Sequence, residues 1–146
     1  MKTRWILLLV LVIFPLAAAL GEDMPRDLMP SGLLVKDALR TVITTQLEAF
    51  RRDDYAGAYR FSHTAFQDQM TVQTFERMVR LGFPAIAHST AAHFGLAFDN
   101  GDDAVINVRI FSANAEPIDY RYVLRREGDT WRITSVTLLK DETTGV

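Results

Sequence analysis

The hydrophobic pattern of the chain changes its period at Pro84, and this change limits the possible folds more than any motif does. Before Pro84, apolar residues recur three and four positions apart, which is typical of amphipathic helices. After Pro84 they alternate with polar residues, which is typical of β-strands. A block of helices followed by a block of closely spaced strands predicts an α+β domain with an antiparallel sheet and the helices on one of its faces.

Three helices are expected before Pro84. The first covers residues 33–52, and its apolar stripe consists of Val35, Leu39, Val42, Ile43, Leu47 and Phe50. Asp53 and Asp54 offer an N-cap for a second, short helix through about residue 61. A third helix is expected from Thr71 to Leu81, where Gly82 favours a helix end.

Four strands are expected after Pro84, within residues 88–98, 104–112, 118–125 and 131–139. The Asn-Gly pair at residues 100–101 is a strong hairpin signal between the first two strands. In the last strand the alternation changes phase between Ile133 and Val136, which predicts a β-bulge near Thr134 and Ser135. The expected domain covers residues 33–140 and is followed by a tail at 141–146.

The first residues have the layout of a targeting segment. Two basic residues precede an apolar run from Trp5 to Leu20, and three alanines at 17–19 supply a cleavage site. The run has 16 residues, fewer than the ~20 that a spanning helix needs. We therefore expect a signal peptide at 1–19, a linker at 20–32, and an exported protein, periplasmic or secreted, without stable membrane insertion after cleavage. An uncleaved membrane anchor is the alternative.

Composition excludes several kinds of function. The chain has no cysteine, so disulfides, thiolate catalysis and zinc–cysteine sites are excluded. Its formal net charge of -2 becomes more negative when the two basic residues of the leader are lost, which argues against a nucleic-acid partner. The three histidines have no spacing typical of a metal site, so neither a metal nor a cofactor is expected.

Three stretches, VITTQLEAFRRDDYAGAYRFS, TFERMVRLGFPAI and WRITSVTL, resemble domain-of-unknown-function family 4864 over about residues 42–139. That family belongs to the nuclear-transport-factor-2-like superfamily of cone-shaped α+β domains. The resemblance implies a curved four-stranded antiparallel sheet wrapped against the helices, with a cavity between them, and it assigns no chemistry. The superfamily includes isomerases, dehydratases, and non-catalytic binding or dimerisation modules, so the fold alone does not choose among them.

Five uncharged polar residues are candidates for lining such a cavity. Gln46 falls near the middle of the apolar stripe of the first helix, where its amide either bonds within the protein or faces a ligand. Tyr55 and Tyr59 share one face of the second helix, and Tyr120 and Tyr122 share one side of a strand. Their hydroxyl groups suit a pocket for a small, partly apolar ligand, but plain core packing predicts the same pattern.

Two histidines are the remaining pocket candidates. His63 follows the second helix and is expected near the mouth of the cavity, and His88 shares a strand phase with Phe94. No residue is assigned a catalytic role. We expect a non-enzymatic module that binds a small apolar ligand or dimerises. The alternative is an isomerase or lyase that uses an inward histidine and a tyrosine.

The other side of the predicted sheet is too apolar to be an ordinary solvated surface. It carries Val105, Phe111 and Val123, with Asn107, Arg109, Arg121 and Arg125 among them. A homodimer formed through this open sheet face would cover these apolar side chains. A monomer with scattered apolar residues is the alternative.

Overall fold

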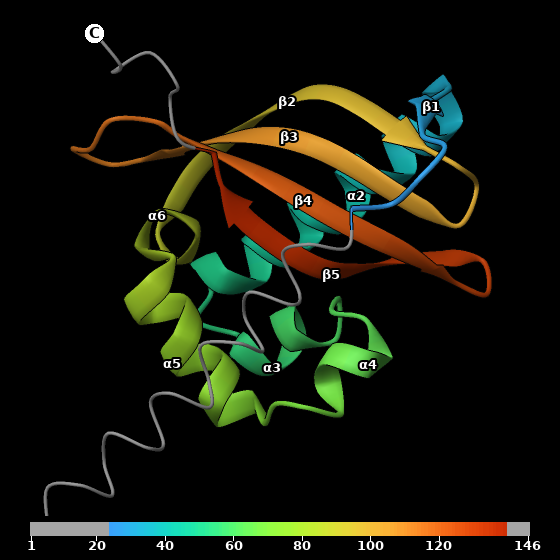
Figure 1. The fold of residues 1–146 in the computed structure, drawn as a ribbon. Coiled ribbons are helices and arrows are strands. Elements are labelled where there is room, and N and C mark those ends of the chain that lie inside the picture. The colour runs from blue at the N-terminus through green and yellow to red at the C-terminus, as the bar shows by residue number, and fades with distance from the viewer. Residues whose placement is uncertain (1–23, 140–146) are drawn as a thin grey trace, which may run out of the picture.

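The computed structural model describes residues 24–139, which form a layer of helices packed against one antiparallel sheet (Figure 1). The elements in chain order are β1 (Met29–Pro30), α2 (Leu33–Arg51), α3 (Tyr55–Tyr59), α4 (Thr64–Gln67), α5 (Val72–Gly82), α6 (Pro84–Ala87), β2 (Ser89–Asp99), β3 (Asp103–Ser112), β4 (Ile118–Glu127) and β5 (Thr130–Leu138). This confirms the α+β class. The predictions about residues 1–19 and 141–146 lie outside the described residues.

The sheet has five strands in the order β1-β2-β3-β4-β5, and all neighbours are antiparallel. The expectation of four strands is therefore wrong by one. The additional strand, β1, pairs Met29 with Asp99 and Pro30 with Phe98. Two residues, one of them a proline, are too few to show any alternation in the sequence. The sheet is open, and β5 forms its edge opposite β1.

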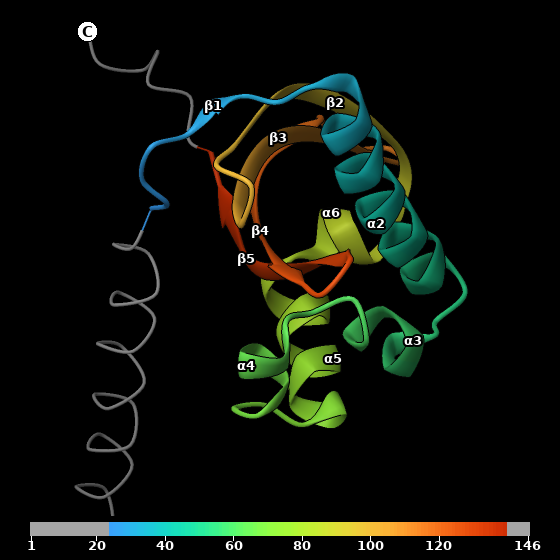
Figure 2. The same cartoon turned by 90° about the vertical axis from the view of Figure 1, so that its right-hand side faces the viewer.

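The core lies between α2 and the sheet, and α2 crosses one face of the strands (Figure 2). Leu39, Ile43 and Leu47, three members of the predicted stripe, are at most 1% exposed. They face the fully buried sheet residues Ile106, Val108, Ile110, Tyr122 and Leu124. Burying one such side chain is worth about 1.5–3 kcal/mol relative to leaving it exposed, so the stripe determines how α2 docks.

The predicted second and third helices are confirmed as α3 and α5. Asp54 caps α3 by accepting a hydrogen bond from the Gly57 N–H over 2.9 Å, and Thr71 caps α5 through the Thr74 N–H over 3.2 Å. Two four-residue helices, α4 and α6, were not expected, because one turn is too short to show a helical period. Pro84 follows the end of α5 and begins α6, where a proline is well tolerated.

Bulges shift the alternation of two strands. The bulge predicted in β5 is confirmed: Ile133 pairs with Leu124 and Ser135 with Val123, so Thr134 is the extra residue. A bulge in β2 was not predicted: unbroken alternation from His88 and Phe94 would place Leu96 on the inward side. One extra residue lies between Phe94 and Ala97, which leaves Leu96 71% exposed.

The face of the sheet away from α2 carries charges arranged in pairs. Arg109 bonds Asp119, and Arg125 bonds Asp103, each at 2.8 Å across neighbouring strands. The chain before β1 also lies on this face, because Met24 and Pro25 border the same hollow as Val123 and Ser135. This outer face is therefore only partly apolar.

Candidate functional site

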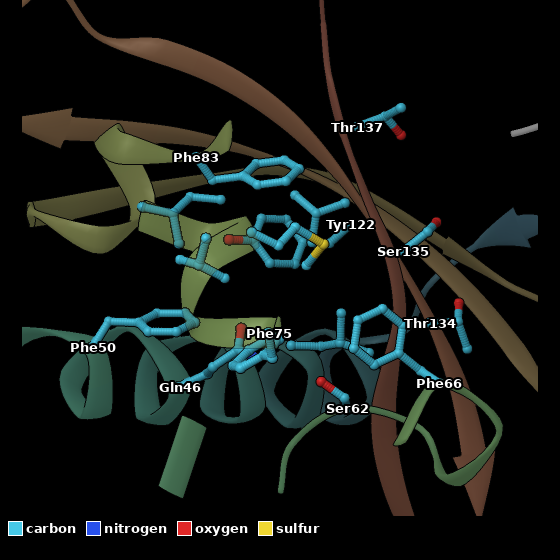
Figure 3. Close-up of a pocket in the computed structure, with 15 residues that line it drawn as sticks. Gln46, Phe50, Ser62, Phe66, Phe75, Phe83, Tyr122, Thr134, Ser135 and Thr137 are labelled. Atoms are coloured by element: carbon cyan, nitrogen blue, oxygen red, sulfur yellow. The ribbon is translucent and has the colours of Figure 1, made fainter. Parts of the chain in front are cut away.

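A pocket of about 270 Å³ lies between α2, α5 and the edge of β5 (Figure 3). Its wall is built from side chains of α2, α5, α6 and β4, the segment around α4, and a continuous stretch of β5. The lining residues are Gln46, Phe50, Ser62, Phe66, Phe75, Met78, Val79, Phe83, Ile86, Tyr122, Ile133, Thr134, Ser135, Val136 and Thr137.

The wall of the pocket is mainly aromatic and aliphatic. Phe75 on α5 is its centre: its ring centroid lies 5.9 Å from that of Phe50 and 6.1 Å from that of Phe66, which meets it edge-on. No aspartate, glutamate, histidine, lysine or arginine is among the lining residues within 24–139. A charged ligand would therefore lose its hydration without gaining a counter-charge, which strongly favours a neutral one.

Gln46 both bonds within the protein and faces the cavity, the two alternatives that its position in the sequence left open. It is 4% exposed, and its Nε2 donates a hydrogen bond to the Ala58 carbonyl oxygen over 3.2 Å. Its side chain also lines the pocket (Figure 3). With the amide nitrogen bound to Ala58, the amide oxygen is left to accept a bond from a ligand.

The turn that connects α2 and α3 brings Ala58 close to Gln46. Asp53 adopts a left-handed conformation, with φ of 56°, directly after α2. The Asp53 N–H bonds the Phe50 carbonyl and the Asp54 N–H bonds the Ala49 carbonyl, which is a Schellman motif. Asp53 therefore closes α2, and only Asp54 caps α3. This tight turn reverses the chain, so that α3 packs against α2.

Tyr122 presents the other buried polar group of the wall. The residue is fully buried, and its hydroxyl has no hydrogen-bond partner within the described part of the chain. Burial, and to a lesser extent the neighbouring Tyr120, raises the pKa of Tyr122 well above the usual tyrosine value. The hydroxyl therefore stays protonated, and a buried hydroxyl without a partner carries a free-energy cost.

Small hydroxyl side chains complete the polar part of the site. Ser62 is 3% exposed and projects from the loop between α3 and α4. Thr134, Ser135 and Thr137 come from β5, and the Thr134 hydroxyl donates to the Val123 carbonyl at 3.0 Å. Figure 3 shows these groups on one side of the cavity, opposite the aromatic rings of Phe50 and Phe83.

Of the predicted tyrosines, only Tyr122 lines the pocket. Tyr55 is buried under Arg80, whose guanidinium lies 4.5 Å from the ring centroid, and its hydroxyl has no partner among residues 24–139. Tyr59 instead ties α3 to the next segment, since its hydroxyl lies 2.8 Å from the Gln67 carbonyl oxygen and 2.5 Å from that of Met70. Tyr120 packs against Phe83 at 6.0 Å between ring centroids.

Neither predicted histidine lines the pocket. His88 was expected on the inward side of a strand, but it ends α6 one residue before β2 begins, and it is exposed. His63 caps α4: its Nδ1 accepts from the Ala65 N–H at 3.1 Å. Its Nε2 lies 3.1 Å from Glu127 Oε1, so both ring nitrogens already have partners.

Part of the pocket wall could not be predicted from the sequence. Ser62 and Phe66 lie in or beside helices too short to have a period, so no pattern pointed to them. The contribution of β5 was missed because it depends on the strand forming the edge of the sheet, which becomes apparent only from strand order. Phe75, Met78 and Val79 belong to the predicted stripe of α5, but a stripe alone does not distinguish a filled core from a pocket wall.

Two other kinds of feature are absent from the described residues. Residues 24–139 contain no group of three or more histidine, aspartate or glutamate side chains placed to hold a metal ion. Within the same residues, no helix has the length and hydrophobicity needed to cross a bilayer.

Comparison with known proteins gives one result. No curated protein and no solved structure matches this chain. The model of the family described as "Domain of unknown function (DUF4864)" matches residues 35–146, which is most of the chain and includes every residue that lines the pocket. The chain therefore belongs to the DUF4864 family.

Proposed function

We propose that this protein binds a small, uncharged and mainly apolar ligand in the pocket between α2, α5 and β5, without transforming it. The observation that carries the proposal is the pocket wall itself, which is apolar except for a few convergent hydroxyl and amide groups. Such a wall is typical of small-molecule sites. The volume of about 270 Å³ lies just below the usual range, which begins at about 300 Å³, and suits a ligand of at most three rings.

The polar groups indicate what the apolar ligand should carry. The amide oxygen of Gln46, which accepts no hydrogen bond from another described residue, is an acceptor, and the hydroxyl of Ser62 can donate or accept. A ligand with one hydrogen-bonding group, such as a hydroxyl or an amide, satisfies more of the wall than a pure hydrocarbon does.

The site supports binding better than isomerase or lyase chemistry. Those reactions need a general acid or base that titrates near neutral pH and lies within reach of the substrate. The pocket offers no such group, since the raised pKa of Tyr122 keeps its proton in place. His63 is bonded through both nitrogens, and His88 is exposed outside the pocket.

The remaining expectations stay as proposals. The resemblance of residues 42–139 supports a place in the cone-shaped nuclear-transport-factor-2-like superfamily, and the layout of residues 1–19 supports export. Phe111, 36% exposed on the outer face, supports a homodimer through that face. Such a dimer would have to accommodate the Arg109–Asp119 and Arg125–Asp103 pairs, so we regard the pocket as the better supported site.

A fluorescence titration tests the proposed function. The neutral dye N-phenyl-1-naphthylamine, which brightens in apolar surroundings, should bind the wild-type protein saturably. Ser62→Leu fills part of the pocket and should weaken this binding at least tenfold. Ser112→Leu, at the end of β3 and outside the pocket, should leave it within twofold of wild type. Equal binding by all three proteins would show that the dye site lies elsewhere, and no binding by the wild type would contradict the proposal.

A further inference from the structure

The edge of β5 forms one side of the pocket. Five consecutive residues, Ile133 to Thr137, line it. Side chains of successive strand residues point to opposite faces of a sheet, so neither face alone can present five in a row. The pocket must therefore run along the edge of the strand, where the backbone itself is part of the wall. Figure 3 shows β5 passing beside the cavity in this orientation.

The register identifies which backbone groups point away from the sheet. β5 has a strand neighbour on one side only, so alternate residues direct their N–H and C=O groups to the open side. Leu139 faces β4, because its N–H donates to the Asp119 carbonyl at 2.9 Å. Because the direction alternates along the strand, the backbone N–H and C=O groups of Leu138 and Val136 point to the open side.

A short segment of the chain, residues 61–63, already pairs with this edge. Ile133 N–H donates to the Phe61 carbonyl, and the His63 N–H donates to the Ile133 carbonyl, each at 2.8 Å, which forms a parallel bridge around Ser62. This pairing ends at His63, because His63 is the N-cap of α4. Beyond Ile133, the open edge continues at Val136, which lines the pocket, and at Leu138, which follows the last lining residue of β5.

We propose that the natural occupant of the pocket is an extended peptide that adds to the β5 edge and inserts one bulky apolar side chain into the cavity. The inference rests on the proposed function, since it names the class of ligand for the same pocket. Backbone hydrogen bonds to Val136 and Leu138 hold the peptide, and the aromatic wall selects the inserted side chain. That side chain is neutral, because the wall has no charged group to pair with it.

A partner peptide fits this edge better than a second copy of the chain. In a two-fold pair of β5 strands, the side chain offered to each pocket would come from the partner's own β5. Val136 already forms the wall of its own pocket, and the neighbouring residues Thr134, Ser135 and Thr137 are small and polar. None of these supplies a bulky apolar group for the cavity, and Leu138, the 51% exposed residue at the end of β5, is the one that the substitutions below examine.

The test uses capped peptides as competitors of N-phenyl-1-naphthylamine on the full-length protein. The probe is acetyl-Ser-Thr-Leu-Thr-Ser-amide, together with its analogue containing phenylalanine in place of leucine. Two further versions each carry one N-methyl group, at the central residue or at the residue after it. Strand addition uses the N–H groups of alternate residues, so only one of the two methylated peptides should lose at least tenfold in affinity. Side-chain insertion without strand addition would leave their affinities equal.

The outcomes separate this inference from the proposed function. Dye binding without displacement by either probe peptide overturns the peptide inference and leaves the proposed function in place. Failure of the wild type to bind both dye and peptides overturns both. Equal loss or equal retention by the two methylated peptides also overturns strand addition.

Two further measurements examine the edge. Leu138→Pro removes a backbone N–H from the open side, and it should weaken peptide binding at least fivefold relative to Leu138→Ala, which keeps that N–H. Sedimentation of the wild type should show no dimer that depends on the β5 edge. A dimer that Leu138→Pro dissociates would identify a second copy as the occupant and overturn the inference.

Discussion

The amide nitrogen of Gln46 donates to the carbonyl oxygen of Ala58 over 3.2 Å, which ties the middle of α2 to α3 at the wall of the pocket. The same carbonyl also accepts a bond from the Phe61 N–H at 3.2 Å. One side chain thus contributes both to holding two helices together and to the polar part of the pocket.

Replacing Gln46 by leucine should lower the free energy of unfolding by about 1 kcal/mol. The carbonyl of Ala58 loses one of its two hydrogen bonds but is not left without a partner, so the loss stays near that of an average bond. Urea denaturation measures the change. Glu48→Leu, on the exposed side of the same helix, is the matched control and should change stability by less than about 0.5 kcal/mol. A Gln46→Leu protein as stable as this control would contradict the assigned bond.

Removing the hydroxyl groups of Tyr55 and Tyr59 should have opposite effects. The Tyr55 hydroxyl is buried without a partner in the described residues, so Tyr55→Phe should be neutral or slightly stabilising. The Tyr59 hydroxyl bonds the carbonyl oxygens of Gln67, the last residue of α4, and of Met70, so Tyr59→Phe should cost about 1 kcal/mol. Denaturation curves of the two variants compare them directly. Equal destabilisation would show that Tyr55 has a partner the structure does not assign.

Glu127 should make part of the stability depend on acid pH. Hydrogen bonds from the Thr64 hydroxyl and N–H, with smaller contributions from His63 and Arg132, hold the pKa of Glu127 below its usual range. A carboxyl with a lowered folded-state pKa stabilises the protein above its unfolded pKa of about 4.3, and this contribution is lost as the pH falls through the folded value.

Glu127→Gln should therefore lower stability at pH 7, and the difference from wild type should shrink as the pH falls below about 4.3. Denaturation at a series of pH values measures this. Glu116→Gln, exposed in the turn between β3 and β4, should follow the wild-type profile. A constant gap between Glu127→Gln and wild type down to pH 2 would contradict the assigned cause.

Gly57 should resist replacement although it lies within a helix. A Cβ there would lie 2.2 Å from Asp54 Oδ2, so the capping side chain would have to move and weaken its bond to the Gly57 N–H. At Gly82, the last residue of α5, such a Cβ would have no atom within 4 Å among the described residues outside its own helix and its chain neighbours. Gly57→Ala should therefore be less stable than Gly82→Ala by about 1 kcal/mol, the value of a typical cap. Equal thermal stability of the two variants would contradict this role for Asp54.

The elements could be predicted from the sequence wherever a local rule acts over enough residues. The spacing of Leu39, Ile43 and Leu47 predicted both α2 and its buried face, and Thr71 marked the start of α5. The phase change around Thr134 predicted the β5 bulge, because alternation is broken there within one strand. Each of these signals depends on near neighbours in the chain.

The pocket could be predicted only in part, since it depends on contacts between distant segments. Gln46 stood out because an amide in an apolar stripe needs a partner, but nothing local identified Ala58 as that partner. His88 was misplaced because the strand begins after it. The role of the β5 edge required knowing that no strand follows β5 in the sheet.

The most direct test of the account is to locate a bound ligand by ¹H–¹⁵N correlation spectra during titration with N-phenyl-1-naphthylamine. We predict saturable shifts for the amides of Gln46, Ser62 and Tyr122 and for residues 133–137. The signals of His93 and Arg109, which are exposed on the outer side of the sheet, should stay in place. Shifts confined to that outer side, or no saturable shifts at all, would contradict the claim that the pocket is a binding site.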